Sequence, residues 1–366
     1  MSEWRHTTLG EFISLQRGHD LPSQNRRPGS VPVIGSGGAT GSHDTARVRG
    51  PGITIGRAAN LGIPVLVNED FWPLNTTLYV TDFHGNDVRF SYYLLRTLDF
   101  TGFNSGSVQP MLNRNYIRSF PVKIPSQRHQ RDISATLGAL DDKIAVNGRV
   151  ARAAEELRAL KFRQWERSNQ ECVESRPLSS FASFVNGRAF TKDATGAGRM
   201  VLRIAEINSG PGASTIYNDV DVPDVHLARP GDVLFAWSGS LAVTRWYRPE
   251  AIVNQHIFKV IPNAGVPVWL AYELLQEKLA DFKSIAAGKA TTMGHIQRRH
   301  LDEPVPAPKW NHMAALDTEL GPLWDCALAA EQESLKLAEF RDTLLPKLMS
   351  GEIRVRDAER IVEDAT

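Results

Sequence analysis

The sequence predicts an α+β protein made of two tandem copies of one module, each followed by a long helical segment. A pattern near the start recurs at a constant shift of 169 residues, pairing Leu9, Phe12, Ser14 and Gly18 with Leu178, Phe181, Ser183 and Gly187. A helical pattern recurs at a shift of 183 residues, pairing Ile133, Leu137, Leu140 and Ile144 with Leu316, Leu320, Leu323 and Ala327. Short β-prone runs precede both helical segments. Two homologous halves therefore follow each other in the same order.

The first module, residues 1–126, is rich in glycine and proline. Its β-prone runs are Val31–Ile34, Gly52–Ile55, Pro64–Val67, Thr77–Val80 and Phe120–Ile124, and a short helix is expected at Ser91–Leu98. In the second module, residues 171–308, the corresponding runs are Val201–Ile204, Asp232–Ala236, Ile252–Val253 and Ile257–Ile261, with a helix at Val268–Ser284. Turn-forming residues bound most of these runs, as expected of strands joined by turns. The order of the strands is not predicted.

The two helical segments, residues 127–170 and 309–353, carry mainly apolar residues at steps that alternate between four and three as far as Ala154 and Leu337, and a tail follows at 354–366. This spacing is typical of a coiled-coil seam. The seam positions are Ile133, Leu137, Leu140, Ile144, Asn147, Ala151, Ala154 and Leu157 in the first segment, and Leu316, Leu320, Leu323, Ala327, Ala330, Ser334, Leu337 and Phe340 in the second.

We expect a kink or break at Gly138 and at Gly321–Pro322, since both residue types disfavour helix interiors. The uninterrupted parts, about 141–168 and 323–349, would each span roughly 40 Å. We expect the two helices to pair as an antiparallel coiled coil with pseudo-twofold symmetry. The alternative is that each helix packs separately on its own module.

Composition places the chain among ordinary globular proteins. It has 366 residues, 42% of them hydrophobic and 23% charged, which suffices for two domains with good cores. No apolar run approaches the roughly 18 residues of a membrane span. The polar start and the two distant cysteines, Cys172 and Cys326, indicate a cytoplasmic protein with reduced thiols. No Cys/His cluster has metal-ligand spacing, so we expect no metal site.

The net charge of +1 conceals an uneven distribution. Residues 1–126 carry 12 basic and 9 acidic side chains, whereas residues 309–366 carry 7 basic and 12 acidic ones. Because phosphate contacts need only a local basic patch, the total charge does not exclude nucleic-acid binding.

Several stretches resemble the DNA-specificity subunit of type I restriction–modification systems. In the first module they are Trp4–Gly18, Val33–Gly41, Pro51–Arg57 and Gly106–Pro125; in the second they are Pro230–Phe235 and Gly288–Leu301; the helical segments add Leu140–Ile144 and Leu344–Ile353. Each motif alone is modest, but their duplicated order covers nearly the whole chain up to about residue 354.

The resemblance implies two target-recognition domains that each read one half of a split duplex DNA sequence. It also implies that the helices act as a ruler and dock methyltransferase subunits, expected to number two, and that a motor–nuclease subunit can join. S-adenosylmethionine would bind those partners, and this chain would bind no cofactor. Half-sites on one face of DNA recur about every 34 Å, which suits a rod near 40 Å with a reader at each end.

The candidate DNA contacts of the first module lie in its loops. The glycine-rich run Gly35–Gly41 lacks the residues of a P-loop or a dinucleotide fingerprint, so it predicts a loop that approaches the DNA backbone, or else a plain flexible turn. Arg57 has the side chain to grip guanine, and Asn60 to grip adenine. The candidates are Ser36, Thr40, His43, Arg47, Arg57, Asn60, Gln109, Asn113 and Arg114.

The candidates of the second module come from the equivalent stretches and from nearby basic residues. They are Arg188, Lys192, Arg203, Ser238, Arg245, Lys289, Thr291, Thr292 and His295. The polar residues of the two modules differ, as they would in two readers of unlike half-sites. Solvated surface charges and drifting loops are the alternative interpretation.

Four large apolar residues of the helical segments are candidate anchors for a partner subunit: Phe162, Trp165, Trp324 and Phe340. The alternative is that they pack against the modules of this chain.

Catalysis by this chain is not indicated. The sequence has no methyltransferase motif of the Asn/Asp-Pro-Pro-Tyr/Phe type, no glycine-rich cofactor fingerprint and no nuclease carboxylate pattern. We therefore expect a non-catalytic DNA-recognition subunit. Two alternatives remain open: a self-contained DNA-modifying enzyme, and a two-module protein scaffold that does not bind DNA.

Overall fold

The computed structural model describes residues 4–100, 102, 111–288 and 294–364. The chain forms two compact units, the first from residues 1–143 and 337–366, the second from residues 144–336. The predicted division into recognition and helical segments stays a prediction, because each unit includes parts of both long helices.

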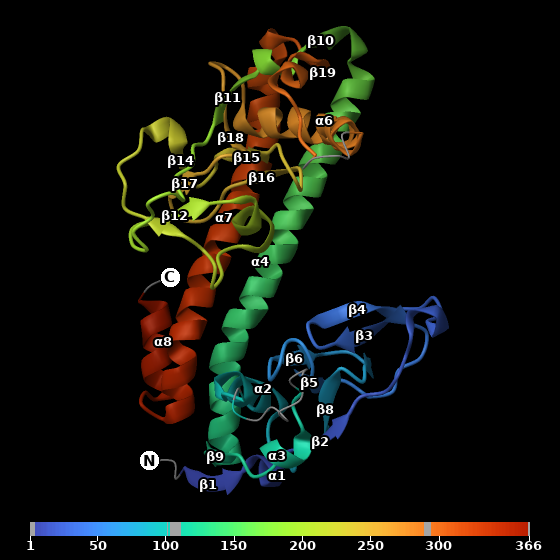
Figure 1. Ribbon diagram of the computed structural model, residues 1–366, viewed down its shortest axis with the longest axis vertical. Coiled ribbons are helices and arrows are strands. Elements are labelled where there is room, and N and C mark those ends of the chain that lie inside the picture. Colours follow the sequence, from blue (N-terminus) through green and yellow to red (C-terminus); the bar gives the residue numbers. More distant parts are fainter. Residues whose placement is uncertain (1–3, 101, 103–110, 289–293, 365–366) are drawn as a thin grey trace. The chain divides into compact units, whose positions relative to one another are not determined.

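The first unit has an antiparallel four-stranded sheet and a three-stranded sheet (Figure 1). The four-stranded sheet has the order β2 (Ser14–Arg17), β8 (Thr77–Asp82), β5 (Gly52–Gly56), β6 (Pro64–Val67). The other has the order β4 (Gly38–His43), β3 (Val31–Gly35), β7 (Trp72–Pro73), and β1 (Arg5–Thr8) pairs with β9 (Pro121–Ile124). The helices of this module are α1 (Leu9–Phe12), α2 (Val88–Thr97) and α3 (Arg114–Ile117), with a 3-10 turn at Ser23–Asn25.

The core of the first unit lies between β5 and α2. Every residue of β5 is buried, since this central strand is covered on both faces. Asp87 caps the start of α2: its carboxylate accepts a 2.8 Å hydrogen bond from the Phe90 amide and so satisfies a free N–H of the first turn. The ring of Phe90 packs edge-on against Phe12, with centroids 6.2 Å apart.

The second unit has two four-stranded sheets. One has the order β11 (Ala182–Asn186), β18 (Ile257–Pro262), β15 (Val233–Ala236), β16 (Ala242–Arg245). The other has the order β13 (Tyr217–Asn218), β12 (Arg199–Leu202), β17 (Ala251–Val253), β14 (Leu227–Ala228), and β10 (Val173–Pro177) pairs with β19 (Pro304–Pro308). The helices are α5 (Ile204–Ser209) and α6 (Val268–Ala287), with 3-10 turns at Gln170–Cys172, Leu178–Ser180, Asp224–His226 and Arg298–Asp302.

The two units repeat one topology. The order β2-β8-β5-β6 of the first corresponds to β11-β18-β15-β16 of the second. Each unit also contains one parallel strand pair: β3 with β7, where Val33 faces Trp72, and β12 with β17, where Val201 faces Ile252. The duplication read from the sequence is therefore also a duplication of structure.

The predicted strands and the predicted helix of each module are confirmed, with ends shifted by a few residues. The glycine-rich run Gly35–Gly41 is not the loop that was predicted, because most of it forms the β3–β4 hairpin, whereas its approach to the DNA backbone stays a prediction. Gly35 pairs with Gly38 across a turn at Ser36–Gly37, and Gly38 and Gly41 have φ of +105° and +141°. Glycine tolerates these angles, so the run forms a strand where its composition indicates a loop.

The predicted breaks at Gly138 and Gly321–Pro322 are also wrong. Helix α4 runs without interruption from Gln127 to Ser168, and α7 from Trp310 to Ser350. Gly138 allows the guanidinium group of Arg89 to lie against the helix, where a Cβ would overlap it. Pro322 is exposed, and burial of its neighbours Leu320 and Trp324 compensates the hydrogen bond that proline removes. A shorter helix, α8 (Val355–Glu363), follows α7.

Within the second unit, the parts of α4 and α7 run antiparallel in contact. Asn147 donates a 2.7 Å hydrogen bond to Glu333, while Lys161 pairs with Glu319 at 2.6 Å, so rising numbers on α4 meet falling numbers on α7. Four small buried residues let the helices approach closely: Ala151, Ala154, Ala327 and Ala330.

One predicted seam residue, Leu157, is 43% exposed, and its neighbour Arg158 is buried in its place. The buried positions of α4 continue as Ala154, Arg158 and Phe162. Arg158 follows Ala154 by four residues and so keeps the alternating steps of four and three, whereas Leu157, three residues after Ala154, departs from them.

No helix among the described residues is long and apolar enough to cross a membrane.

Candidate nucleic-acid interface

The candidate interface of the first unit is built on a glycine at the end of β2. The amide of Gly18 donates to the Thr77 carbonyl at 3.0 Å, and a Cβ on Gly18 would overlap the Leu74 carbonyl. The amide of Asn75 in turn donates to the carbonyl of His19 at 3.1 Å. These two hydrogen bonds join the segment after β2 to the segment before β8, and they bring His19 and Asn75 together.

Arg57, directly after β5, adds a third and a fourth segment. Its amide donates to the Thr76 carbonyl at 2.9 Å, and its carbonyl accepts from the Leu112 amide at 2.9 Å. We call this joined set of segments the platform of the first unit. Above it lies an open groove of about 500 Å³, lined by Gln16, Arg17, Gly18, His19, Asp20, Arg57, Leu78, Asn113 and Arg114.

The groove carries more positive than negative charge. Three arginines line it, Arg17, Arg57 and Arg114, against one carboxylate, Asp20, which accepts a hydrogen bond from the Asn75 amide group. Burial and the neighbouring charge of Arg17 lower the pKa of Arg57. Within the described ranges, no carboxylate lies at ion-pair distance from Arg57. Such a groove attracts phosphates and hydrogen-bond acceptors of bases.

The second unit builds the same platform. The amide of Gly187 donates to the Ile257 carbonyl at 3.0 Å, and a Cβ on Gly187 would overlap the Asn254 carbonyl. The amide of Gln255 donates to the Arg188 carbonyl at 2.9 Å.

Trp237 occupies the backbone position of the second unit that corresponds to Arg57 in the first. Its amide donates to the His256 carbonyl at 3.1 Å, and its carbonyl accepts from the Ile296 amide at 3.2 Å. Its ring lies 5.2 Å from that of His256 and 5.7 Å from that of Phe258, and its indole N–H donates to Asn186 at 2.8 Å. Arg188 and Gln255 are exposed beside it.

The structure brings Arg57, Asn113 and Arg114 of the predicted set together at the groove, although Asn113 also uses its side-chain oxygen to cap α3. Thr40 and Asn60 are exposed, Ser36 is half-buried, and exposed Arg47 lies over the ring of Trp72.

The prediction for His43 is contradicted. Its side chain is 4% exposed, its Nδ1 accepts from the Arg27 amide at 3.0 Å, and its ring packs edge-on against Trp72. The imidazole stabilises the hairpin and cannot reach DNA.

The position of Arg245 also contradicts the prediction that it contacts DNA. It is 3% exposed, and its guanidinium group lies 2.9 Å from both Glu155 and Glu331, over the ring of Trp324. A cation held this way has no face left for a phosphate. It therefore packs the second module against the adjoining parts of α4 and α7.

The other candidates of the second unit are scattered. Ser238 is buried and forms an isolated antiparallel β-bridge with His295. Arg203 forms an ion pair with Glu206 at the start of α5. Arg188 and Lys192 are exposed. Four candidates lie outside the described residues: Gln109, Lys289, Thr291 and Thr292.

Two of the predicted docking residues are core residues. Phe162 and Trp324 are buried in the main apolar cluster of the second unit, where Phe162 packs against Trp269 at 5.6 Å. Packing against the module leaves neither ring for a partner, so the prediction for these two is wrong. Trp165 is partly buried against the same cluster, and Phe340, in the first unit, is half-buried.

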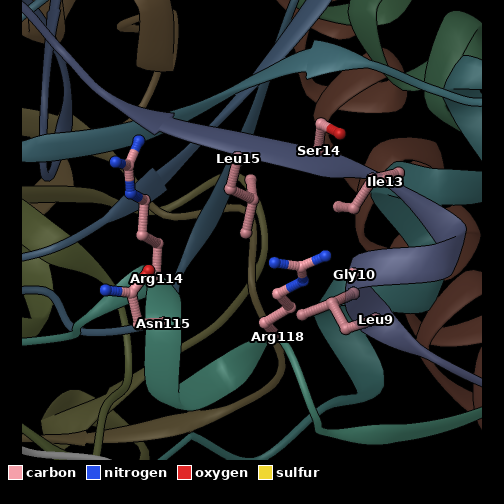
Figure 2. Close-up of a pocket in the computed structure, with 8 residues that line it drawn as sticks. All are labelled: Leu9, Gly10, Ile13, Ser14, Leu15, Arg114, Asn115 and Arg118. Atoms are coloured by element: carbon pink, nitrogen blue, oxygen red, sulfur yellow. The ribbon is translucent and has the colours of Figure 1, made fainter.

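A second cavity of the first unit, about 300 Å³, is lined by Leu15 of β2 and by Arg114 and Arg118 (Figure 2). Figure 2 shows Arg114 and Arg118 extending from α3 and its C-terminal end toward β2. Gly10 permits this packing, since a Cβ there would overlap the Arg118 side chain. Arg114 thus lines both this cavity and the groove.

Sequence reasoning missed several platform residues, namely Arg17, His19 and Asn75 in the first unit and Gln255 in the second. The signal was present: the constant shift of 169 residues pairs Gly18 with Gly187, and so His19 with Arg188. The other platform residues carried no such signal, because the carbonyl that each glycine contacts is known only from the structure.

Comparison with known proteins agrees with this geometry. Residues 1–155 match the family model of the type I restriction modification DNA specificity domain. The resemblance to type I DNA-specificity subunits is thereby confirmed. No curated protein sequence matches the chain.

Among solved structures, the chain is similar to the S subunit of a type I restriction–modification system from M. genitalium. The identity is 16%, the TM-score is 0.64, and the match covers 95% of this chain and 96% of that one. The HsdS subunit from Thermoanaerobacter tengcongensis also matches, at 15% identity with a TM-score of 0.33, over 96% of this chain and 97% of that one. At this identity, the first of these likenesses shows a shared fold across nearly the full length.

Proposed function

We propose that this chain is the non-catalytic specificity subunit of a type I restriction–modification complex and that it binds a bipartite sequence in duplex DNA. The observation that carries the proposal is the duplicated platform, whose backbone hydrogen bonds repeat while its outward side chains differ. Two similar surfaces with unlike side chains suit a ligand with two unlike half-sites.

The cationic groove of the first unit supports DNA as that ligand. Arg17 and Arg114 are exposed, and Arg57 adds a third guanidinium group beneath them. Arginine in such a groove donates to phosphates and to base edges, and the resulting affinity falls steeply with salt.

We further propose that the helices dock two methyltransferase subunits, which bind S-adenosylmethionine and carry out the transfer in the cytoplasm, and that a motor–nuclease subunit can join them. On α4, the exposed apolar residues Val146, Val150, Leu157 and Leu160 follow one another at steps of four, seven and three. Residues so spaced lie on one face of a helix, which is the arrangement that an amphipathic partner helix contacts.

The test is reconstitution of the chain with its methyltransferase subunits. We expect methylation of duplex DNA only with all subunits present, with specific binding that weakens strongly between 50 mM and 200 mM salt. Methylation by the isolated chain would instead support the self-contained enzyme, and complex formation without any DNA binding would support the scaffold.

The docking surface is tested by Leu157→Asp. Because Leu157 is exposed, the variant should fold normally yet fail to bind the methyltransferase subunits, whereas Glu156→Gln, next to it on the helix, should bind them as wild type does.

A further inference from the structure

The two platforms present different side chains from matching backbone positions. The first unit presents His19, Arg57 and Asn75; the second presents Arg188, Trp237 and Gln255 at the positions whose amides and carbonyls make the same bonds. Because the backbone is repeated, the difference in side chains is a difference in what each platform can recognise.

Arg57 is fixed in position and has unused donors. It is half-buried, and one of its nitrogen atoms donates to the Asn75 carbonyl at 3.4 Å. A guanidinium group has five N–H donors. Among the described residues, that carbonyl is the one hydrogen-bond acceptor recorded for the side chain, and no carboxylate pairs with it. The remaining donors line an open groove.

The position of Arg57 distinguishes it from the other arginines of the groove. Arg17 and Arg114 are exposed, as phosphate contacts commonly are. Arg57 is held by backbone bonds on both sides and partly by its own side chain. A pre-positioned fork of donors matches two acceptors in one plane, and guanine offers such a pair, O6 and N7, in the major groove.

We propose that Arg57 reads a guanine of the first half-site and that the second half-site lacks this contact, since Trp237 occupies that place. The indole ring packs on His256 and Phe258, and its N–H is bonded to Asn186, so it offers no donor pair. This inference rests on the proposed function and adds a base identity to one half of the target.

The experiment uses the reconstituted complex and duplexes in which each guanine of the methylated motif, on either strand, is replaced in turn by 7-deazaguanine. This base lacks the N7 acceptor. We expect one replacement in the first half-site to lower the affinity of the wild-type complex about tenfold. The Arg57→Gln complex should bind that duplex and the unmodified duplex equally, while keeping its response to guanines of the second half-site.

Arg114→Gln is the matched control, since it removes a guanidinium group from the same groove. It should weaken binding to all duplexes by a similar factor and reduce the slope of log affinity against log salt by about one.

The proposal is overturned if no guanine in the first half-site responds in the wild-type complex, or if Arg57→Gln still responds to the same guanine. The first result does not depend on the folding of any variant. A complex that methylates no split motif at all would instead contradict the proposed function, so the two failures are distinguishable.

Discussion

At the scale of single residues, burial separates arginines that hold the fold from arginines that can bind a ligand. Arg245 bridges Glu155 and Glu331 with its side chain 1% exposed, whereas Arg57 lines a groove and has no such partner in the part of the chain that the structure describes. Arg57 follows β5 and Arg245 ends β16, in equivalent sheets of the two units. From the sequence, both were predicted equally as DNA contacts. Arg245 is paired because Glu155 of α4 and Glu331 of α7 lie beside it, and both are distant from it in the sequence.

Replacing Arg245 by Met should destabilise the second unit by about 2 kcal/mol. This is less than the roughly 3–5 kcal/mol expected for breaking a fully buried pair, because both glutamates keep some contact with water. Chemical denaturation measures the change. Arg188→Met is the control, and an equally small effect of both would show that the bridge contributes little.

Glu166 should make stability depend on pH. Burial, with the neighbouring charges of Glu277 and Glu273, raises its pKa to about 7. A carboxyl group whose pKa is higher in the folded state binds more protons folded than unfolded, so stability falls as pH rises from about 4.5 to about 7.

Glu166→Gln should therefore reduce the loss of stability across that window, as measured by thermal unfolding at pH 5 and pH 8. Exposed Glu156→Gln on the same helix serves as control. A loss of stability as steep in the variant as in the wild type would contradict the assignment.

At the scale of elements, the platforms depend on close approach of two backbone segments. Gly187→Ala should destabilise the second unit by roughly 1–3 kcal/mol, since the added Cβ would overlap the Asn254 carbonyl and backbone cannot move as a side chain can. Gly212→Ala meets no atom within 4 Å and should be nearly neutral. Equal unfolding midpoints for both variants would count against the close approach.

The elements also show which parts of the fold were predictable. Buried runs such as Val233–Ala236 were readable because apolar residues between turn signals form central strands. The hairpin at Gly38–His43 was not, because a glycine-rich run indicates a turn until its pairing is known. Continuity of α7 through Pro322 was missed because burial of neighbouring side chains outweighs local propensity, and no local signal reports it.

At the scale of the whole molecule, the duplication predicted the topology better than it predicted the site. The repeated glycines lie in both platforms, yet the candidate DNA contact chosen beside Arg57 was Arg245, whereas the backbone bonds match Arg57 with Trp237. Small insertions change the shift between halves from one segment to the next, so loop residues cannot be aligned without their hydrogen-bond partners.

Exchange of the first module tests the modular organisation. A hybrid that carries residues 1–126 of a related subunit should change only the first half of the methylated motif. The exchanged module must keep Arg89 and Tyr93, whose side chains bind Asp142 and Asp141 on α4 beyond the exchange point. Methylome sequencing of cells with the hybrid gives the result, and a change in both half-sites would contradict independent reading.

We propose above all that this chain selects a split DNA sequence for methylation. Methylome sequencing of the host with and without this gene, with the partner methyltransferase expressed, tests it most directly. We predict that deletion abolishes methylation at one motif composed of two half-sites and a fixed spacer, and that the gene supplied in trans restores it. An unchanged set of methylated motifs after deletion would contradict the claim.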